Sequence, residues 1–221
     1  MKSCIIVGAG ELPEKAAANL QQRAAWCYII AADGGLRHLE CLNIVPDAII
    51  GDFDSVDEGT VFQRNARGDA PYEVVELPRE KDVSDMAAAI DHGLERGCEE
   101  FHIYGGAGGR LDHTLANVQL LAGLVRQNKR GFLYGEHEIV TAIQREPISF
   151  AAESAGVFSV FSHGGKASGV IIHGAKYLLD NATLSNDTPL GLSNEFIGEP
   201  IQVSAESGTL MIVFKYDAML L

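Results

Sequence analysis

Two aspartates stand one residue apart in the stretch PDAIIGDFDSV, residues 46–56, at the end of an apolar run. If the segment is extended, Phe53 points the opposite way and leaves the carboxylates of Asp52 and Asp54 on one side. Paired carboxylates suit Mg²⁺, which prefers oxygen ligands and is usually held by one or two carboxylates together with substrate phosphates. Taken alone, the pair is nearly as well explained by a solvated turn.

The elements around this pair alternate between strands and helices. Apolar runs predict strands, and segments with helical periodicity separate them. An alternating order of this kind predicts a mostly parallel sheet covered on both faces. The predicted strands are 4–10, 27–35, 48–52, 72–78 and 101–106, and the predicted helices are 13–25, 84–97 and 111–127, with Gly97 as a helix stop.

Polar or glycine-rich residues follow four of these strands. In open parallel sheets, ligands bind beyond the carboxyl ends of the strands, so these residues should meet at one edge. Their convergence favours a metal site over a solvated turn. The residues are Asp33, Gly34 and Gly35, then Asp52 and Asp54, then Lys81, Asp82, Ser84 and Asp85, and finally Gly108, Gly109, Arg110, Asp112 and His113.

This set of residue types fits the chemistry of phosphates bound with magnesium. Phosphates on a metal need cationic side chains and backbone N–H donors for their remaining charge. Arg110 stands at the start of a helix, after glycines that let the backbone approach a phosphate closely. We therefore expect a phosphate-binding site at this edge of the sheet.

Each piece also has a structural explanation. Asp82 and Asp85 could cap the following helix, and Asp112 could be a favourable acid in a first helical turn. His113 and Asn117, four residues apart, could form a satisfied pair on one helix face. GAGELP, residues 8–13, is only a fragment of a dinucleotide-binding fingerprint and is better explained as a strand-end turn.

The pattern changes near Gly131. From there to Leu221 the sequence predicts short strands separated by Gly, Ser, Asn and Pro, which favours an antiparallel, sandwich-like arrangement. We expect two domains, an α/β domain over residues 1–140 and an all-β domain over residues 141–221. The strands are predicted at 131–135, 137–143, 147–151, 157–163, 168–174 and 208–216.

Composition excludes several classes of function. A net charge of −13, from 17 Lys and Arg against 30 Asp and Glu, argues against nonspecific binding of nucleic acid or of anionic membranes. The four cysteines form no CxxC pair, which favours free thiols. Without a signal-like or membrane-spanning segment, the sequence predicts a cytoplasmic protein.

Several motifs resemble, in order, those of the thiamine pyrophosphokinase family. They are AADGG (31–35), PDAIIGDFDSV (46–56), EKDVSDMAAAI (80–90), GGAGGRLDHTLAN (105–117), GAKYLL (174–179) and GLSNEF (191–196). The resemblance implies an α/β nucleotide-binding catalytic domain, a β-rich domain for thiamine binding and dimerisation, and a homodimer with sites at the subunit interface. It also implies transfer of pyrophosphate from ATP, with Mg²⁺, to thiamine, giving thiamine diphosphate and AMP.

The resemblance assigns roles to residues of this sequence. The metal and phosphate-site carboxylates would be Asp52, Asp54, Asp82 and Asp85, with Arg110 on the ATP phosphates and Asp112 catalytic. Nucleotide binding would involve Asp33, Gly34, Gly35, Lys81, Gly109, Arg110, His113 and Asn117. The residues implied at the thiamine ring are Tyr177, which would stack on it, and Ser193 and Asn194.

Three other functions stay open at the level of sequence. A related pyrophosphokinase could act on a pterin alcohol. DFDSV also fits the DxDx[TV] pattern of phosphatases in which the first aspartate, here Asp52, is the nucleophile. A sensor of thiamine or nucleotide could share the fold without catalysis.

For the pyrophosphokinase, positioning of the substrates and neutralisation of their charge dominate catalysis. Asp85 or Asp112 would orient or deprotonate the acceptor hydroxyl.

Overall fold

The computed structural model describes residues 1–52, 71–78 and 83–221, which form two compact units. The N-terminal unit comprises Met1–Asn117 with Leu133–Glu136, and the C-terminal unit comprises Val118–Phe132 with His137–Leu221. Four residues named above, Phe53, Asp54, Lys81 and Asp82, lie outside the described ranges.

The N-terminal unit is built on five parallel strands in the order β4-β3-β2-β1-β5. In the register of the sheet, Val7 lies between Ala31 and Tyr104, and Ala32 lies beside Ile50. The carboxyl ends of the strands are therefore aligned at one edge, as the sequence predicted. The strands are β1 (Ser3–Val7), β2 (Tyr28–Ala32), β3 (Ala48–Gly51), β4 (Glu73–Glu76) and β5 (Glu100–Tyr104).

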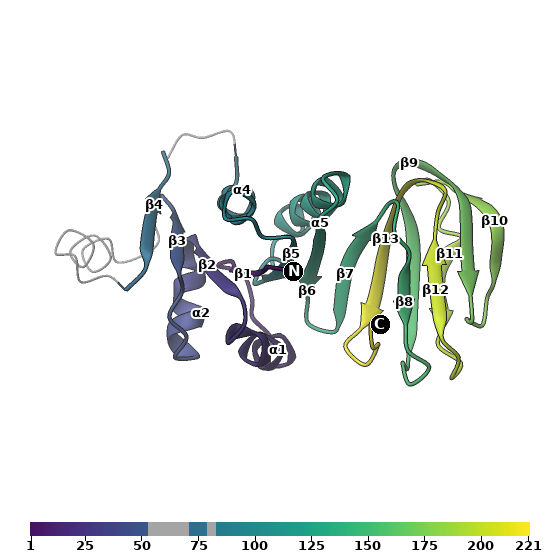
Figure 1. Cartoon of the computed structure of the whole chain (residues 1–221), viewed down its shortest axis with the longest axis horizontal. Coiled ribbons are helices and arrows are strands. Elements are labelled where there is room, and N and C mark those ends of the chain that lie inside the picture. The colour runs from purple at the N-terminus through teal and green to yellow at the C-terminus, as the bar shows by residue number, and fades with distance from the viewer. Residues whose placement is uncertain (53–70, 79–82) are drawn as a thin grey trace. The chain divides into compact units, whose positions relative to one another are not determined.

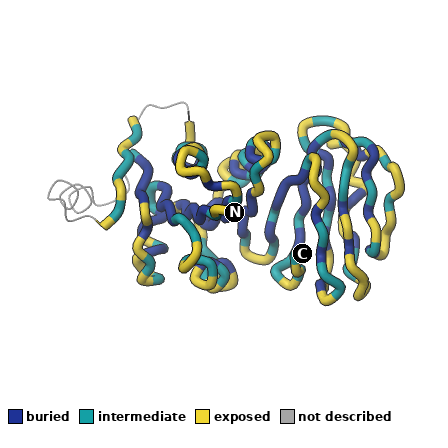
Figure 2. The backbone as a smooth tube through the Cα atoms, viewed as in Figure 1, coloured by how far each residue is buried: buried dark blue, intermediate teal, exposed yellow. Residues whose placement is uncertain are grey.

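Continuous apolar runs make the central strands fully buried, as expected for a parallel sheet with both faces covered. Figure 2 shows these strands as the dark blue centre of the unit. One face carries α4 (Asp85–Glu95), and the other carries α1 (Glu14–Ala24) and α2 (Leu36–Cys41) (Figure 1). A short 3₁₀ turn, η1 (Asp33–Gly35), links β2 to α2.

Local capping sets the length of α4. The Ser84 hydroxyl accepts a hydrogen bond from the Ala87 backbone N–H at 3.2 Å, so Ser84 is the cap and Asp85 is the first residue of the helix. At the other end, Gly97 has a φ of 76°, and the N–H groups of Gly97 and Cys98 bond back to Leu94 and Gly93. This is a Schellman motif, which confirms Gly97 as the helix stop.

The buried face of α5 (Leu111–Arg126) differs from the expected one. The sequence predicts an apolar side formed by Leu111, Leu115, Val118 and Val125. Leu111 and Leu115 are 70% and 54% exposed, whereas the two valines are half-buried. The buried positions are Asn117, Leu121, Ala122 and Leu124. The first turn of α5 therefore faces outward, and the apolar spacing identifies the buried side of this helix only in part. None of the helices in the described ranges is long and apolar enough to cross a membrane.

The C-terminal unit is an antiparallel β structure in which β7, β13, β9, β12 and β8 follow one another, and β10 and β11 also pair with β9. This confirms the predicted β-rich part. Its strands are β7 (Glu138–Ile143), β8 (Ile148–Phe150), β9 (Val157–His173), β10 (Leu179–Leu184), β11 (Gly191–Glu195), β12 (Ile201–Ser204) and β13 (Ser207–Lys215); β6 (Arg130–Tyr134) is divided between the two units.

One long strand, β9, replaces the two strands predicted at 157–163 and 168–174. Its first half pairs with β13 and β11, and its second half pairs with β12 and β10. Gly164, Gly165 and Gly169 all have positive φ, so the strand turns at the glycines without ending. The change of partners along β9 gives the unit its sandwich-like form.

Four phenylalanines form the aromatic core of the C-terminal unit. The Phe150 ring centroid lies 5.2 Å from that of Phe214, 5.3 Å from that of Phe196 and 6.2 Å from that of Phe158. Phe150 is completely buried. These edge and tilted contacts add to the large apolar area that each ring removes from water.

Replacing Phe150 by alanine should lower the free energy of unfolding by about 3–5 kcal/mol, because it removes a buried ring and leaves a cavity. Urea denaturation followed by circular dichroism measures this loss. The control is Trp26→Ala, since Trp26 is 88% exposed, and it should change stability by less than about 0.5 kcal/mol. Equal losses in both variants would contradict the assigned core.

Candidate active site

A cavity of about 720 Å³ lies at the carboxyl edge of the parallel sheet, within the N-terminal unit. It is formed by the segments that follow β1, β2 and β5 and by the first turns of α4 and α5. A site at this edge is what the topology of an open parallel sheet predicts. The predicted residues that line it are Asp33, Ser84, Asp85, Gly108, Gly109, Arg110, Asp112, His113 and Asn117.

Backbone contact between two glycine-containing segments builds one wall of the cavity. The Gly8 N–H donates to Tyr104 O at 2.8 Å, and the Gly10 N–H donates to Gly105 O at 3.0 Å. A Cβ atom on Gly10 would lie only 2.6 Å from Gly105 O. The approach therefore requires the absence of a side chain, and it leaves the wall lined by backbone.

Asp33 sits at the end of β2 in an unusual conformation. Its φ of 47° is left-handed, a region that aspartate tolerates better than most residues. The strained turn begins η1 and places Asp33 on the cavity surface, whereas Gly34 and Gly35, also predicted near the nucleotide, do not line it. Such outliers gather at functional sites.

Arg110 and Asp112 form a two-point ion pair at the cavity. Arg110 Nη2 lies 2.6 Å from Asp112 Oδ2, and Arg110 Nε donates to Asp112 Oδ1 at 3.2 Å. The hydrogen bonds from Arg110 hold the pKa of Asp112 below its ordinary value, and the same contact raises the pKa of Arg110. Both side chains are largely exposed, so the guanidinium stays accessible to an anionic ligand.

Asn117 and His113 occupy the same cavity from α5. Asn117 is 6% exposed, and its side-chain amide donates to Gly106 O at 2.7 Å. This bond ties the segment after β5 to the helix that follows it. His113 is exposed one turn earlier, so the two residues share the cavity but differ in role: Asn117 holds the backbone in place.

Asp52 follows β3 directly. The Leu77 N–H donates to Gly51 O at 2.9 Å, so the chain leaving β4 runs beside the residue that precedes Asp52. That arrangement brings residues 77–78 to the edge where the acidic cluster was predicted. Within the described ranges, no group of three or more His, Cys, Asp or Glu side chains is arranged as a metal site.

Sequence reasoning missed the segment Gly8–Glu11, all of which lines the cavity. It was interpreted as a plain turn because it lacks the third glycine of the dinucleotide fingerprint. The signal that could have found it was its position, since it follows a buried strand that adjoins both β2 and β5.

The residues implied at the thiamine ring form a separate cluster in the C-terminal unit. The buried Asn194 side chain accepts from the Tyr177 backbone N–H at 3.0 Å and donates to Tyr177 O at 2.6 Å. Ser193 has a φ of 58°, and its N–H donates to the Ser159 hydroxyl. The Tyr177 ring is exposed, so Asn194 holds the backbone of a residue whose ring faces outward.

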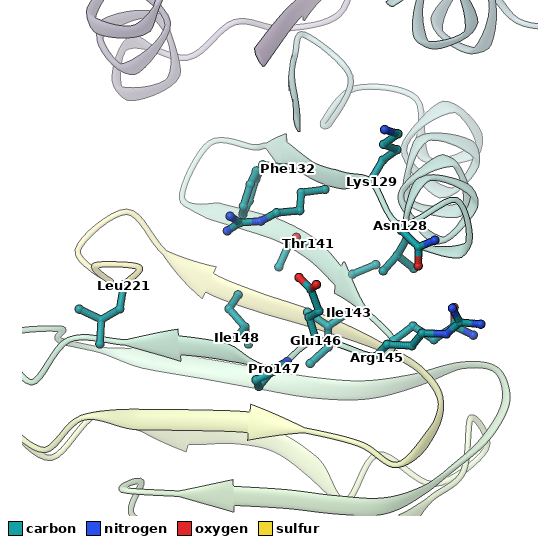
Figure 3. Close-up of a pocket in the computed structure, with 14 residues that line it drawn as sticks. Asn128, Lys129, Phe132, Thr141, Ile143, Arg145, Glu146, Pro147, Ile148 and Leu221 are labelled. Carbon is teal, nitrogen blue, oxygen red and sulfur yellow. The ribbon is translucent and has the colours of Figure 1, made fainter. Parts of the chain in front are cut away.

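A second cavity, of about 240 Å³, lies within the C-terminal unit (Figure 3). Apolar residues such as Phe132, Ile143 and Ile148 form part of its lining. Lys129 and Arg145 extend away from Thr141 in this view, so their charges do not converge on the cavity. Among the residues that the structure describes, no residue predicted for the active site lines it.

An open parallel sheet with a glycine-lined cavity, acidic side chains and an arginine at its carboxyl edge is typical of α/β enzymes that act on phosphate-containing ligands. Comparisons with known proteins identify the family. The family model described as thiamin pyrophosphokinase, catalytic domain, matches residues 20–133, and the model described as thiamin pyrophosphokinase, vitamin B1 binding domain, matches residues 145–210.

Individual relatives agree with the family models. A thiamine pyrophosphokinase from Bacillus subtilis is 30% identical over 199 residues, covering 85% of this chain and 87% of the relative. A crystal structure of the B. subtilis enzyme superposes with a TM-score of 0.82 at 26% identity, covering 97% of this chain and 99% of that one. The crystal structure of a thiamin pyrophosphokinase from Geobacillus thermodenitrificans superposes with a TM-score of 0.80 at 26% identity. The match covers 96% of this chain and 97% of that one.

The chain therefore belongs to the thiamin pyrophosphokinase family. The predicted family, the predicted enzyme class and the α/β plus β-rich fold are confirmed.

The Arg110–Asp112 pair gives a titration that can be measured. Because the pKa of Asp112 is depressed in the folded state, the stabilising contribution of the pair is present above about pH 4 and is lost as the pH falls through the folded-state value. Arg110→Gln should raise the pKa of Asp112 toward the ordinary value of an unpaired aspartate, as measured by carbon NMR of the labelled carboxyl. The control is Arg126→Gln, at the far end of helix α5 from Asp112, and it should leave the pKa of Asp112 unchanged. An equal shift in that control would contradict the pairing.

Proposed function

We propose that this enzyme transfers the pyrophosphoryl group of ATP to the hydroxyl of thiamine, giving thiamine diphosphate and AMP. The main observation in support of this proposal is the cavity of the N-terminal unit. Backbone groups, carboxylates and Arg110 line this one space, in a chain that matches the thiamin pyrophosphokinase catalytic domain. Its 720 Å³ is in the size range of cofactor and small-molecule sites.

The proposed metal is Mg²⁺. Asp52 and Asp85 supply carboxylates from segments at the carboxyl edge of the sheet, and Asp54 and Asp82, outside the described ranges, are proposed to complete the set. Oxygen donors of this kind fit Mg²⁺, because that ion needs only one or two carboxylates in addition to water and phosphate oxygens. Bound there, it would offset the negative charge that the acidic residues and ATP share.

The proposed reaction is an in-line displacement at the β-phosphorus. The acceptor hydroxyl oxygen forms a bond to that phosphorus, the bond from phosphorus to the α,β-bridging oxygen breaks, and AMP leaves with that oxygen. Asp85 or Asp112 takes or orients the hydroxyl proton. Arg110, with Lys81 as a further proposed contact, binds phosphate oxygens, and the backbone beside Gly109 lies against them.

Arg110 need not be released from Asp112 for this role. A guanidinium carries five N–H donors, and the pair uses the one on Nε and one of the two on Nη2. In the proposed site the other donors bind the ligand while Asp112 fixes the plane of the group. Asp33, His113 and Asn117 complete the proposed nucleotide site.

The proposed thiamine site lies on the C-terminal unit. There the exposed Tyr177 ring offers a stacking surface for the pyrimidine. The exposed Ser193 supplies polar groups beside it, and the buried Asn194 contributes by holding the Tyr177 backbone in place. We propose that a homodimer brings this surface to the cavity of the other subunit. Cytoplasmic location is part of the same proposal.

Incubation with ATP, Mg²⁺ and thiamine should produce AMP and thiamine diphosphate in equal amounts, identified by mass. Removal of the metal with EDTA should stop the reaction. A pterin alcohol should not replace thiamine. Formation of ADP in step with product, or turnover of the pterin alcohol alone, would contradict the proposal.

The Asp52→Asn variant keeps the shape of the side chain but removes its charge. It should lower kcat by about 100-fold or more, as when a group that stabilises transition-state charge is lost. Asp91→Asn, an exposed aspartate on α4 that does not line the cavity, is the matched control and should keep full activity. A phosphatase would instead yield a trapped aspartyl-phosphate on Asp52.

Mixing two inactive variants tests whether the sites are shared between subunits. Asp52→Asn removes a group of the N-terminal unit, and Tyr177→Ala removes one of the C-terminal unit. If each site combines these units from different chains, mixed dimers contain one intact site and activity returns on subunit exchange. Activity that stays at the level of the separate variants, in dimers shown by mass to be mixed, would contradict a shared site.

A further inference from the structure

The backbone of Gly10 is held on both sides. Its N–H donates to Gly105 O at 3.0 Å, and its carbonyl oxygen lies 2.7 Å from Nε2 of His38. Gly10 therefore joins the segment after β1 both to the segment after β5 and to helix α2. Because Gly8–Glu11 line the cavity, these bonds decide where one wall of the nucleotide site lies.

His38 does not itself line the cavity. It lies on α2 (Leu36–Cys41), which begins directly after the η1 turn that carries Asp33. The buried Leu36 and Leu39 fix α2 against the sheet. A side chain on this helix therefore has a defined position relative to both Asp33 and Gly10.

We propose that His38 is a positioning residue for the nucleotide site: its ring N–H holds Gly10 and so sets the wall formed by Gly8–Glu11. The inference rests on the proposed function only in taking ATP as the ligand of the cavity. It assigns a role to a histidine that the motifs of this family resemblance do not include.

The chemistry of the contact defines which substitutions matter. A carbonyl oxygen accepts, so His38 must carry a proton on Nε2, as one neutral tautomer and the imidazolium both do. Glutamine reaches a similar point with an N–H donor, whereas glutamate of the same length presents an oxygen to an oxygen. Alanine removes the bond altogether.

The experiment compares His38→Ala, His38→Gln and His38→Glu with the wild-type enzyme and with His163→Ala, a control on β9 in the C-terminal unit. KM for ATP, KM for thiamine and kcat are measured under AMP-producing conditions, and the Kd for ATP with Mg²⁺ is measured without thiamine by calorimetry. Melting temperatures report whether each variant is folded.

We expect KM and Kd for ATP to rise about three- to tenfold in His38→Ala, the worth of one hydrogen bond, with KM for thiamine and kcat within about twofold. KM and Kd for ATP should rise at least as much in His38→Glu. In His38→Gln and His163→Ala they should stay within about twofold of the wild-type values. Because glutamine and glutamate have the same shape, their comparison decides the matter even if His38→Ala does not fold.

The inference is overturned if glutamine and glutamate have equal effects, if ATP binding is unchanged in both His38→Ala and His38→Glu, or if KM for thiamine rises as much as KM for ATP. Failure of the proposed function gives a different result, in which the wild-type enzyme itself forms no AMP with thiamine. In that case the Kd values for ATP still test the role of His38.

Discussion

The close approach of two backbone segments is the constraint on which the site depends. Gly8 and Gly10 bond to the chain at Tyr104 and Gly105 because no side chain stands between them. This contact extends the pairing of β1 with β5 past the end of the sheet. The cavity therefore lies directly beyond the ends of the buried strands, and one of its walls is backbone. Its polar side chains come from the segment after β1, from η1, and from the starts of α4 and α5 with the residues just before them, and the sheet determines where these segments lie.

Charge explains how an acidic protein can hold an anionic substrate. The chain carries a net charge of −13, yet ATP would enter a cavity lined by four acidic side chains, those of Glu11, Asp33, Asp85 and Asp112. Repulsion is offset where the ligand's phosphates meet Arg110, backbone N–H groups and, in the proposed mechanism, Mg²⁺. Asp112 does not simply add negative charge, because its carboxylate is paired with Arg110 at two points. The local field therefore differs from what the overall composition suggests.

Sequence predicted most of the fold because the parallel strands are continuous apolar runs and the helices between them have clear ends, as at Gly97. It placed Asp33, Asp85, Arg110 and Asp112 at one edge because topology aligns strand ends. It failed where tertiary contacts decide the outcome. The role of GAGELP depends on the segment after β5 that lies beside it. The exposure of Leu111 and Leu115 depends on what packs against α5. The glycines of β9 bend a strand that they were expected to end.

The two units hold their functional residues by the same physical means. In the N-terminal unit, the buried Asn117 amide holds Gly106, and exposed groups of the neighbouring helical turn face the cavity. In the C-terminal unit, the buried Asn194 amide holds both backbone groups of Tyr177, whose ring is exposed. Leaving such an amide unpaired would be costly in either place, so each asparagine is tied to one backbone arrangement. A side chain on such a segment can then be exposed and still have a defined position, because the buried asparagine amide fixes the backbone nearby.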